Sequence, residues 1–161
     1  MTTPVAFSPA AKSKFDEIEA RYPTKRAAIM PTLWLAQEEF GWLSNAVLEY
    51  VAGLLELSPA FTASVASFYT MYYKQPVGKH HVQVCTNLSC ALVGSDAIVD
   101  CLRQRLGIEV GETTADGRFT LNVVECLASC GTAPMMQIND DFWEQLTPKR
   151  TLEIIDRLAR E

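Results

Sequence analysis

Four of the five cysteines form two closely spaced pairs, and four thiols are a donor set for a metal or redox centre. Cys85 and Cys90 enclose four residues, and Cys126 and Cys130 enclose three. Each pair follows a short apolar run with the character of a β-strand, VQV before the first pair and TLNVVE before the second. Thiols at the ends of two strands can converge, and in a reducing compartment such thiols bind metal more often than they form disulfides.

The spacing leaves three chemistries open. Zinc sites favour pairs separated by two to four residues, so Cys85–Cys90 lies at the upper limit, without the usual glycine. A dithiol enzyme needs C-x-x-C at a helix N-terminus, and the sequence has no such motif. A [2Fe–2S] cluster takes two thiolates per iron, which four cysteines supply. A Rieske centre would need two histidine ligands, and the adjacent His80 and His81 precede both pairs.

The composition is that of a globular chain. Its 161 residues suffice for one domain with a small appendage, and 48% of them are hydrophobic and 20% charged. The formal net charge of -5 argues against nucleic-acid binding. No apolar run reaches the roughly 18 residues of a membrane span, and the N-terminal segment lacks a signal-peptide core. We therefore expect a cytosolic chain in a reducing compartment.

The first half of the chain has the apolar spacing of helices. This pattern extends from Ala10 to about Ser67. Pro31 lies inside the second helix expected there, over about residues 24–40, which predicts either a kink or a later start. Ser44 and Ser58 are expected N-caps of the following helices. These features predict a helical bundle as an N-terminal domain over residues 1–75.

The second half, beyond a joint at Gln75–Gly78, alternates between strands and helices. The predicted elements are a strand over His81–Val84, a helix over Ala91–Leu106, a strand over Phe119–Val124, a hairpin of Met135–Ile138 and Phe142–Leu146, and a helix after Thr147-Pro148. We expect the first helix to turn Leu92, Ala97 and Cys101 inward. This order predicts an α/β fold, a thioredoxin-like domain with a four-stranded mixed sheet over residues 76–161.

Several runs of this sequence together resemble one protein family. They are SFYTMY (67–72), PVGK (76–79), VCTNLSC (84–90), GETTADGRFTL (111–121), VECLASCGTAP (124–134) and QIND (137–140). The chain resembles, over nearly its whole length, the E-type subunit of NADH–quinone oxidoreductase, the thioredoxin-like [2Fe–2S] ferredoxin component of respiratory complex I. The family often has Gly-Ala between its last two cysteines, where this chain has Ala128-Ser129. Alanine adopts a positive φ less readily than glycine, so this loop is the main departure from the family.

The resemblance implies the ligands and the role of the chain. The family's ligands carry over to Cys85, Cys90, Cys126 and Cys130, which would hold one [2Fe–2S] cluster. The chain would be an electron-transfer subunit that exchanges single electrons with the FMN of a partner NADH-oxidising flavoprotein (the F-type subunit of the complex). FMN and NADH would lie on that partner, so no catalytic residue and no turnover are expected from this chain alone.

The resemblance also implies that the chain is part of a larger complex, and it leaves alternative functions open. A second expected partner is the adjacent multi-cluster iron–sulfur subunit. The expected location is cytoplasmic, in the peripheral arm of a complex on the cytoplasmic face of a bacterial inner membrane. The alternatives are the equivalent diaphorase subunit of an NAD-linked hydrogenase or formate dehydrogenase, a zinc-stabilised interaction module, and a thiol oxidoreductase without a cluster.

Other conspicuous residues have simpler interpretations. Cys101 is expected to pack in the core rather than to bind metal. His80 and His81 are expected to form the polar entry to a strand. The aromatic stretch over residues 68–73 favours packing between the two halves over a docking surface. Glu125 either opposes reduction of a bound cluster or is a solvated strand end.

Overall fold

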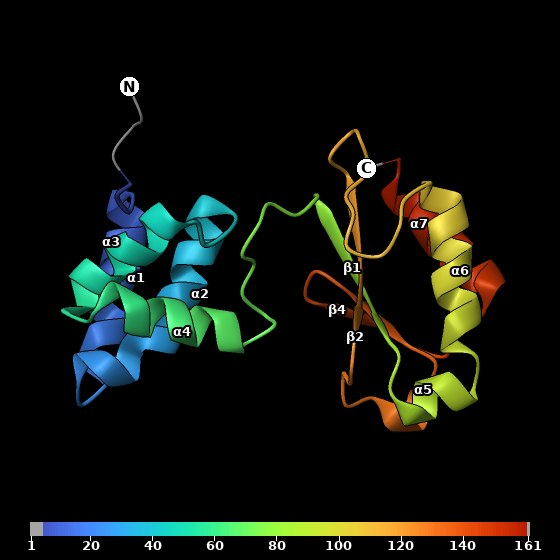
Figure 1. Cartoon of the computed structure of the whole chain (residues 1–161), viewed down its shortest axis with the longest axis horizontal. Helices are drawn as coiled ribbons and strands as arrows, with labels where there is room; N and C mark the ends of the chain where they lie inside the picture. Colours follow the sequence, from blue (N-terminus) through green and yellow to red (C-terminus); the bar gives the residue numbers. More distant parts are fainter. Residues whose placement is uncertain (1–4, 161) are drawn as a thin grey trace. The chain divides into compact units, whose positions relative to one another are not determined.

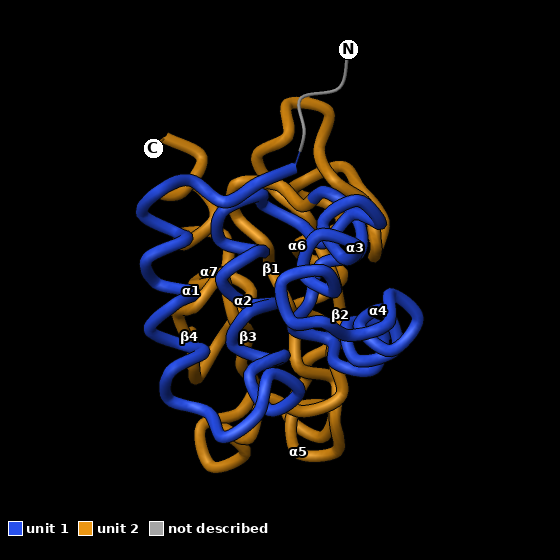
Figure 2. The backbone as a smooth tube through the Cα atoms, turned by 90° about the vertical axis from the view of Figure 1, so that its left-hand side faces the viewer, with its two compact units in different colours: residues 1–76 blue, residues 77–161 orange. Residues whose placement is uncertain are grey.

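The computed structural model describes residues 5–160, which form a helical part followed by a four-stranded mixed sheet with helices (Figure 1). This order of elements confirms the predicted fold class. The chain divides into two compact units, residues 1–76 and 77–161 (Figure 2). That each unit is an independent domain stays a prediction.

Unit 1 is a bundle of helices with serine caps. Its elements are α1 (Pro9–Arg21), the 3-10 helix η1 (Lys25–Ala28), α2 (Ile29–Phe40), α3 (Asn45–Leu55) and α4 (Pro59–Phe68). Ser44 accepts a hydrogen bond from the backbone N–H of Val47, and Ser58 from that of Phe61. These bonds satisfy N–H groups that the helix leaves unpaired, which confirms both predicted N-caps. Pro31 lies in the first turn of α2, so the helix starts later than residue 24 and the proline interrupts no hydrogen bond.

The segment after α4 is tied to α2 by hydrogen bonds. Tyr72 is 1% exposed in the core of unit 1, and its hydroxyl donates to the carbonyl of Met30 at 2.9 Å. The Gln37 side chain donates to the carbonyl of Met71 and accepts from the N–H of Tyr73. Tyr72 therefore belongs to the bundle itself, which corrects the predicted packing between the halves. Phe68 is 79% exposed, and its role stays a prediction.

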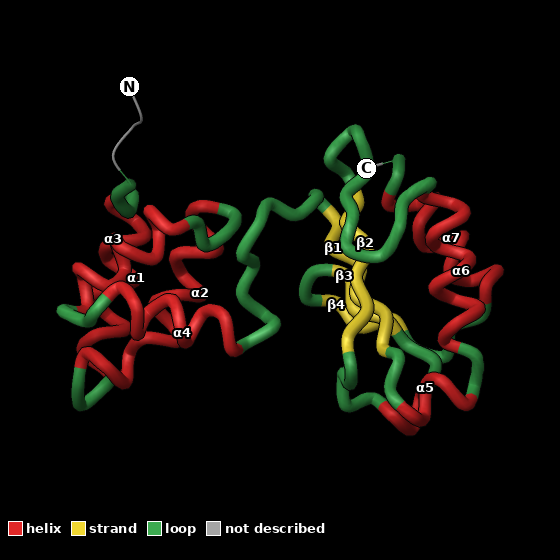
Figure 3. Tube along the Cα trace, in the orientation of Figure 1, coloured by secondary structure: helices red, strands yellow, loops and turns green. Residues whose placement is uncertain are grey.

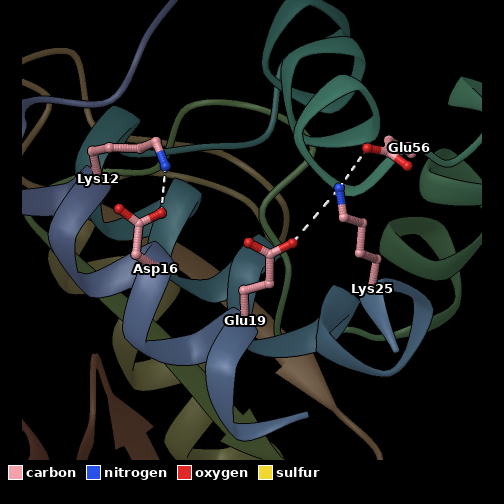
Figure 4. A network of polar contacts seen from close by, with 5 residues as sticks. All are labelled: Lys12, Asp16, Glu19, Lys25 and Glu56. Carbon is pink, nitrogen blue, oxygen red and sulfur yellow. Dashed lines mark hydrogen bonds and ion pairs between the residues drawn. The ribbon is translucent and has the colours of Figure 1, made fainter. Parts of the chain in front are cut away.

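Exposed ion pairs join the helix ends of unit 1 (Figure 4). The Lys25 ammonium lies 3.7 Å from Glu19 and 2.5 Å from Glu56, while Lys12 pairs with Asp16 within α1. Exposed pairs of this kind contribute little to stability, because water and salt screen them. The core, rather than these pairs, therefore holds the bundle together.

Unit 2 is a sheet with helices on one face (Figure 3). The strands are β1 (His80–Cys85), β2 (Phe119–Val124), β3 (Met136–Ile138) and β4 (Asp141–Trp143), in the order β2-β1-β3-β4. β1 runs parallel to β2 and antiparallel to β3, and β3 runs antiparallel to β4. β4 is shorter than the predicted strand Phe142–Leu146, because residues 144–146 leave the sheet and turn toward the loop that follows β2.

The helix predicted over Ala91–Leu106 is two helices, α5 (Leu88–Leu92) and α6 (Ser95–Leu106). Gly94 separates them with a φ of 93°, which glycine adopts at little cost. Leu92 is 78% exposed and Ala97 is also exposed, so the prediction that they face inward is wrong. The break separates α5, which contains Cys90, from α6, which packs on the sheet.

Cys101 lies on α6, and its side chain faces the start of the last helix, α7 (Pro148–Leu158). Its side chain is half-buried, and its Sγ lies 3.7 Å from the carbonyl oxygen of Pro148. Burial raises the pKa of the Cys101 thiol. The residue therefore contributes to helix packing, although less deeply than predicted, and lies apart from the other cysteines.

Within residues 5–160, no single helix is long and apolar enough to cross a membrane. The helices α3 and α4 meet that test of length and composition only as a pair, and they are bent by 117° to each other.

His80 and His81 begin β1 as expected, but both side chains are buried, at 5% and 3% exposure. The Nε2 of His81 lies 2.7 Å from the side-chain nitrogen of Asn122, and its backbone N–H donates to Asn139. Burial lowers the pKa of His81 to about 4. The folded chain therefore keeps this imidazole neutral at pH values at which an unfolded chain protonates it.

Because His81 stays neutral in the folded chain, we predict that the protein becomes less stable as the pH is lowered. Between an unfolded pKa of about 6.5 and the folded value of about 4, only the unfolded chain binds the proton, so the free energy of unfolding decreases as the pH falls. The full loss of about 3 kcal/mol is reached only below about pH 4, and about 2 kcal/mol of it develops between about pH 7.5 and about pH 5. Urea unfolding at about pH 7.5 and about pH 5 measures it. The variant His81→Gln should show a smaller loss, and equal losses in both proteins would contradict the prediction.

Candidate metal centre

The parallel pairing of β1 with β2 places the two cysteine pairs at one edge of the sheet. The register aligns Cys85 with Val124, the last residues of the two strands. The backbone N–H of Thr86 donates to the carbonyl of Val124 at 3.0 Å, which extends the ladder by one residue. Parallel neighbours end at the same edge, so Cys126, two residues after Val124, emerges beside Cys85.

The four thiols lie close enough to interact in a closed ring, since Cys90 also interacts with Cys130. The Sγ atoms of Cys126 and Cys130 are 3.9 Å apart, and the thiol of Cys85 interacts with those of Cys90 and Cys126. All four are free thiols. Among the described residues, no group of three or more His, Cys, Asp or Glu side chains is arranged to hold a metal ion.

The site has a buried side and an exposed side. Cys85 and Cys90 are 3% and 2% exposed and pack against the fully buried Met135. Cys126 and Cys130 are exposed. The carbonyl of Met135 also accepts a hydrogen bond from the N–H of Cys85, which ties the end of the second cysteine loop to β1. The first pair is therefore fixed by the core, whereas the second lies where a partner can approach.

The two buried thiols have opposite acidities. Burial by itself raises the pKa of Cys85, but hydrogen bonds from the backbone of Asn87 and Leu127 and from the thiols of Cys90 and Cys126 outweigh it, so the pKa is lowered. Burial first, and then the neighbouring Cys85, raises the pKa of Cys90 to about 11. The backbone at this edge thus stabilises a thiolate at Cys85, the ionised form that binds metal.

The second cysteine loop contains a strained residue. Ala128 has a φ of 63°, in the left-handed region that favours glycine, and its N–H donates to the Sγ of Cys126 at 3.3 Å. The short 3-10 helix η2 (Cys130–Thr132) follows. The loop of this chain therefore adopts a positive φ at the position where the sequence departs from its family.

The side chain of Glu144, outside the second cysteine loop, supports this loop. Ser129 and Thr132 both donate hydrogen bonds to the same carboxylate oxygen of Glu144, which lies after β4. These two donors, Ser129 first, lower the pKa of Glu144. Neither Glu144 nor Met135 could be assigned to the site from the sequence, because neither lies in a motif with the cysteines and only the folded sheet brings them there.

The first cysteine pair lies at a shorter helix than the sequence predicts. The predicted helix begins directly after Cys90 and runs from Ala91 to Leu106. Instead α5 has five residues, and Asn87 caps it by accepting from the N–H of Leu88. Glu125 is exposed, and its backbone oxygen lies 3.6 Å from the Sγ of Cys85.

Comparison with known proteins identifies the family. Residues 15–159 match the thioredoxin-like [2Fe-2S] ferredoxin family, which is nearly the whole chain. The chain belongs to this family. Its thioredoxin-like fold and the resemblance recognised in the sequence are thereby confirmed.

Relatives within the thioredoxin-like [2Fe-2S] ferredoxin family match the chain along most of its length. An E-type subunit of NADH-quinone oxidoreductase in Rhizobium meliloti is 48% identical over 138 residues, which are 84% of this chain and 82% of the relative. The E-type subunit of NADH-quinone oxidoreductase in Rickettsia felis is 42% identical over an alignment of 164 residues, which covers 100% of this chain and 98% of the relative.

A solved structure with the same fold is a chain of an NAD+-reducing [NiFe]-hydrogenase in the air-oxidized state. It superimposes with a TM-score of 0.72 at 22% identity, over 82% of this chain and 23% of the hydrogenase chain. At this identity the likeness shows the fold alone.

The thiol arrangement fits the cluster that gives this family its name. One zinc ion requires its four donors around a single centre, whereas a [2Fe–2S] cluster is held by two thiolates on each of two irons. A separation of 3.9 Å between the Sγ atoms of Cys126 and Cys130 is close to the edge of a tetrahedron with metal–sulfur bonds of about 2.3 Å. Cys126 and Cys130 can therefore share one metal ion, and with Cys85 and Cys90 the site offers the two thiolates per iron that a [2Fe–2S] cluster needs.

Because Ala128 has a φ in the left-handed region, we predict that Ala128→Gly stabilises the protein. The substitution removes a strain of about 1 kcal/mol, partly offset by the greater freedom of glycine in the unfolded chain. Thermal unfolding of the iron-loaded protein measures the change.

The matched control is Ala97→Gly, at an exposed position inside α6. This change should lower the free energy of unfolding by about 1 kcal/mol, because glycine is a poor helix former. Destabilisation of similar size by both substitutions would show that Ala128 carries no strain.

Proposed function

We propose that the chain is the E-type electron-transfer subunit of an NADH:quinone oxidoreductase and that Cys85, Cys90, Cys126 and Cys130 bind one [2Fe–2S] cluster. The observation that carries the proposal is the meeting of the two cysteine pairs at the ends of β1 and β2 in a member of this family. The relatives that match along most of their length are themselves named as E-type subunits of that enzyme. The hydrogenase likeness concerns the fold alone, so the diaphorase alternatives have less support.

The two cysteine pairs and Met135 would have different roles in the site. A bound [2Fe–2S] cluster would supply one-electron transfer. Cys85 and Cys90 would bind it from the protein core, with Met135 excluding water from that side. Cys126 and Cys130 would bind it from the surface, where a partner can come close. NADH oxidation would take place on the partner flavoprotein, so turnover would belong to the assembly.

The proposed partner is the FMN- and NADH-binding flavoprotein, and the chain carries an apolar surface suited to it. Leu88, Leu92 and Val93 of the α5 region are 70%, 78% and 54% exposed and flank Cys90. Exposed apolar groups gathered beside a functional site mark protein interfaces. Docking here would bring the flavin near the cysteines and would shield them from water.

We extend the proposal to the rest of the assembly on the strength of the relatives' names. A multi-cluster iron–sulfur subunit would be the second neighbour. The chain would then sit in the peripheral arm of the complex, on the cytoplasmic face of a bacterial inner membrane.

Serine substitutions test the ligand assignment. In the anaerobically purified protein, iron and sulfide content and visible absorption should report one [2Fe–2S] cluster. Replacing Cys85, Cys90, Cys126 or Cys130 by serine should remove most of the colour, because a serine oxygen replaces the sulfur poorly. The matched control Cys101→Ser should keep it. A colourless protein that contains zinc and no iron would overturn the proposal.

A charge on the apolar surface tests the docking of the flavoprotein. Leu92→Glu should weaken co-purification of the flavoprotein by about tenfold or more, since a buried unpaired charge costs several kcal/mol. Cluster content should stay unchanged. The control Val110→Glu changes another exposed apolar side chain, outside the α5 region, and should leave co-purification intact. Equal effects of the two substitutions would rule out this surface.

A further inference from the structure

The loop that carries Cys126 and Cys130 is largely exposed, and its apolar contact is that of the partly buried Leu127 with the cluster around Met135. Residues 125 and 126, 128, and 130 and 131 are exposed, and the Ala128 backbone is strained. The first pair, by contrast, is fixed by the buried Met135. A strained, exposed loop keeps one conformation only if polar contacts hold it.

Glu144, the residue that directly follows β4, supplies such contacts. Its Oε1 accepts hydrogen bonds from Ser129 Oγ and from Thr132 Oγ1, the latter at 2.6 Å. The two hydroxyl oxygens are 2.7 Å apart, and Thr132 Oγ1 also lies 3.1 Å from the carbonyl oxygen of Ser129. With one hydrogen on each hydroxyl, the arrangement is satisfied when both donate to an ionised carboxylate.

The backbone beside Glu144 continues this connection. The N–H of Gln145 donates to the carbonyl of Thr132 at 2.8 Å, and the N–H of Leu146 donates to the carbonyl of Pro134 at 2.9 Å. Gln145 has a φ of 50°, an uncommon value for a residue other than glycine. Four hydrogen bonds from three consecutive residues thus fasten the segment that contains Cys130.

We infer that Glu144 is a positioning residue for the second cysteine pair: it holds the turn from Ser129 to Thr132 that presents Cys130, and its negative charge makes reduction of the site harder. The inference rests on the proposed function, because it concerns the cluster that these cysteines would hold. Ser129 stands where the family often has alanine, so the hydroxyl that meets Glu144 belongs to this chain's own version of the loop.

Geometry and charge have separable effects. Loss of the carboxylate group frees the turn, and a ligand that moves freely releases its metal more readily. Loss of the charge alone leaves the turn in place. Loss of the negative charge of Glu144 favours reduction of the cluster, because a cluster held by four thiolates gains a further negative charge when it takes up an electron.

The test compares Glu144→Ala with Glu144→Gln in the iron-loaded full-length protein. Glu144→Ala should lose its cluster to an iron chelator about tenfold faster than wild type. Glu144→Gln should keep the wild-type rate, because its amide oxygen still accepts from both hydroxyls. Its midpoint potential should become more positive, and the electron paramagnetic resonance lines of its reduced form should stay as narrow as in wild type. Ser129→Ala, which leaves only Thr132 as a donor, should release iron at an intermediate rate.

The matched control is Asp141→Asn, an exposed carboxylate on β4 of the same hairpin. It should change neither the release rate nor the potential. Unchanged iron release in Glu144→Ala, or an unchanged potential in Glu144→Gln, would overturn the inference. If Glu144→Ala does not fold, the Glu144→Gln potential and the Ser129→Ala release rate still decide. Wild-type protein without iron would instead overturn the proposed function, and this inference with it.

Discussion

The parallel pairing of β1 with β2 is the constraint on which the candidate metal centre depends. Antiparallel strands would end at opposite edges, and the two cysteine pairs would then be separated by the length of a strand. A parallel pair requires a crossover, which α5 and α6 supply between residues 88 and 106. The same crossover covers one face of the sheet with α6, so one connection builds both the site and the core beneath it.

The site combines two kinds of support. On one side, burial fixes Cys85 and Cys90 among apolar groups, where packing density leaves little freedom. On the other side, hydrogen bonds fix an exposed loop that contains a residue in the left-handed region. This division suits an electron carrier, because a rigid inner half limits reorganisation and an accessible outer half allows a partner to come close.

Local features of the fold were predictable to within a few residues. The strand Phe119–Val124 was predicted with its observed bounds, and the caps Ser44 and Ser58 were correct, because both depend on residues only a few positions away. The break at Gly94 was not predicted, since the apolar spacing continues across it. Only packing shows that Leu92 faces solvent while Ile98 enters the core. The burial of His80 and His81 likewise follows from their neighbours in the sheet.

The sequence by itself determined the donor set, its spacing, its position after two strands and the family to which the chain belongs. Each of these properties resides in residues that are close together along the chain. Tertiary structure alone decided which thiols are buried, which residue excludes water from them, and that Glu144 fastens a loop lying 12 to 15 residues before it. Burial and long-range hydrogen bonds arise where segments that are distant in the sequence come into contact. The spacing of residues within one segment does not predict which other segment it will contact.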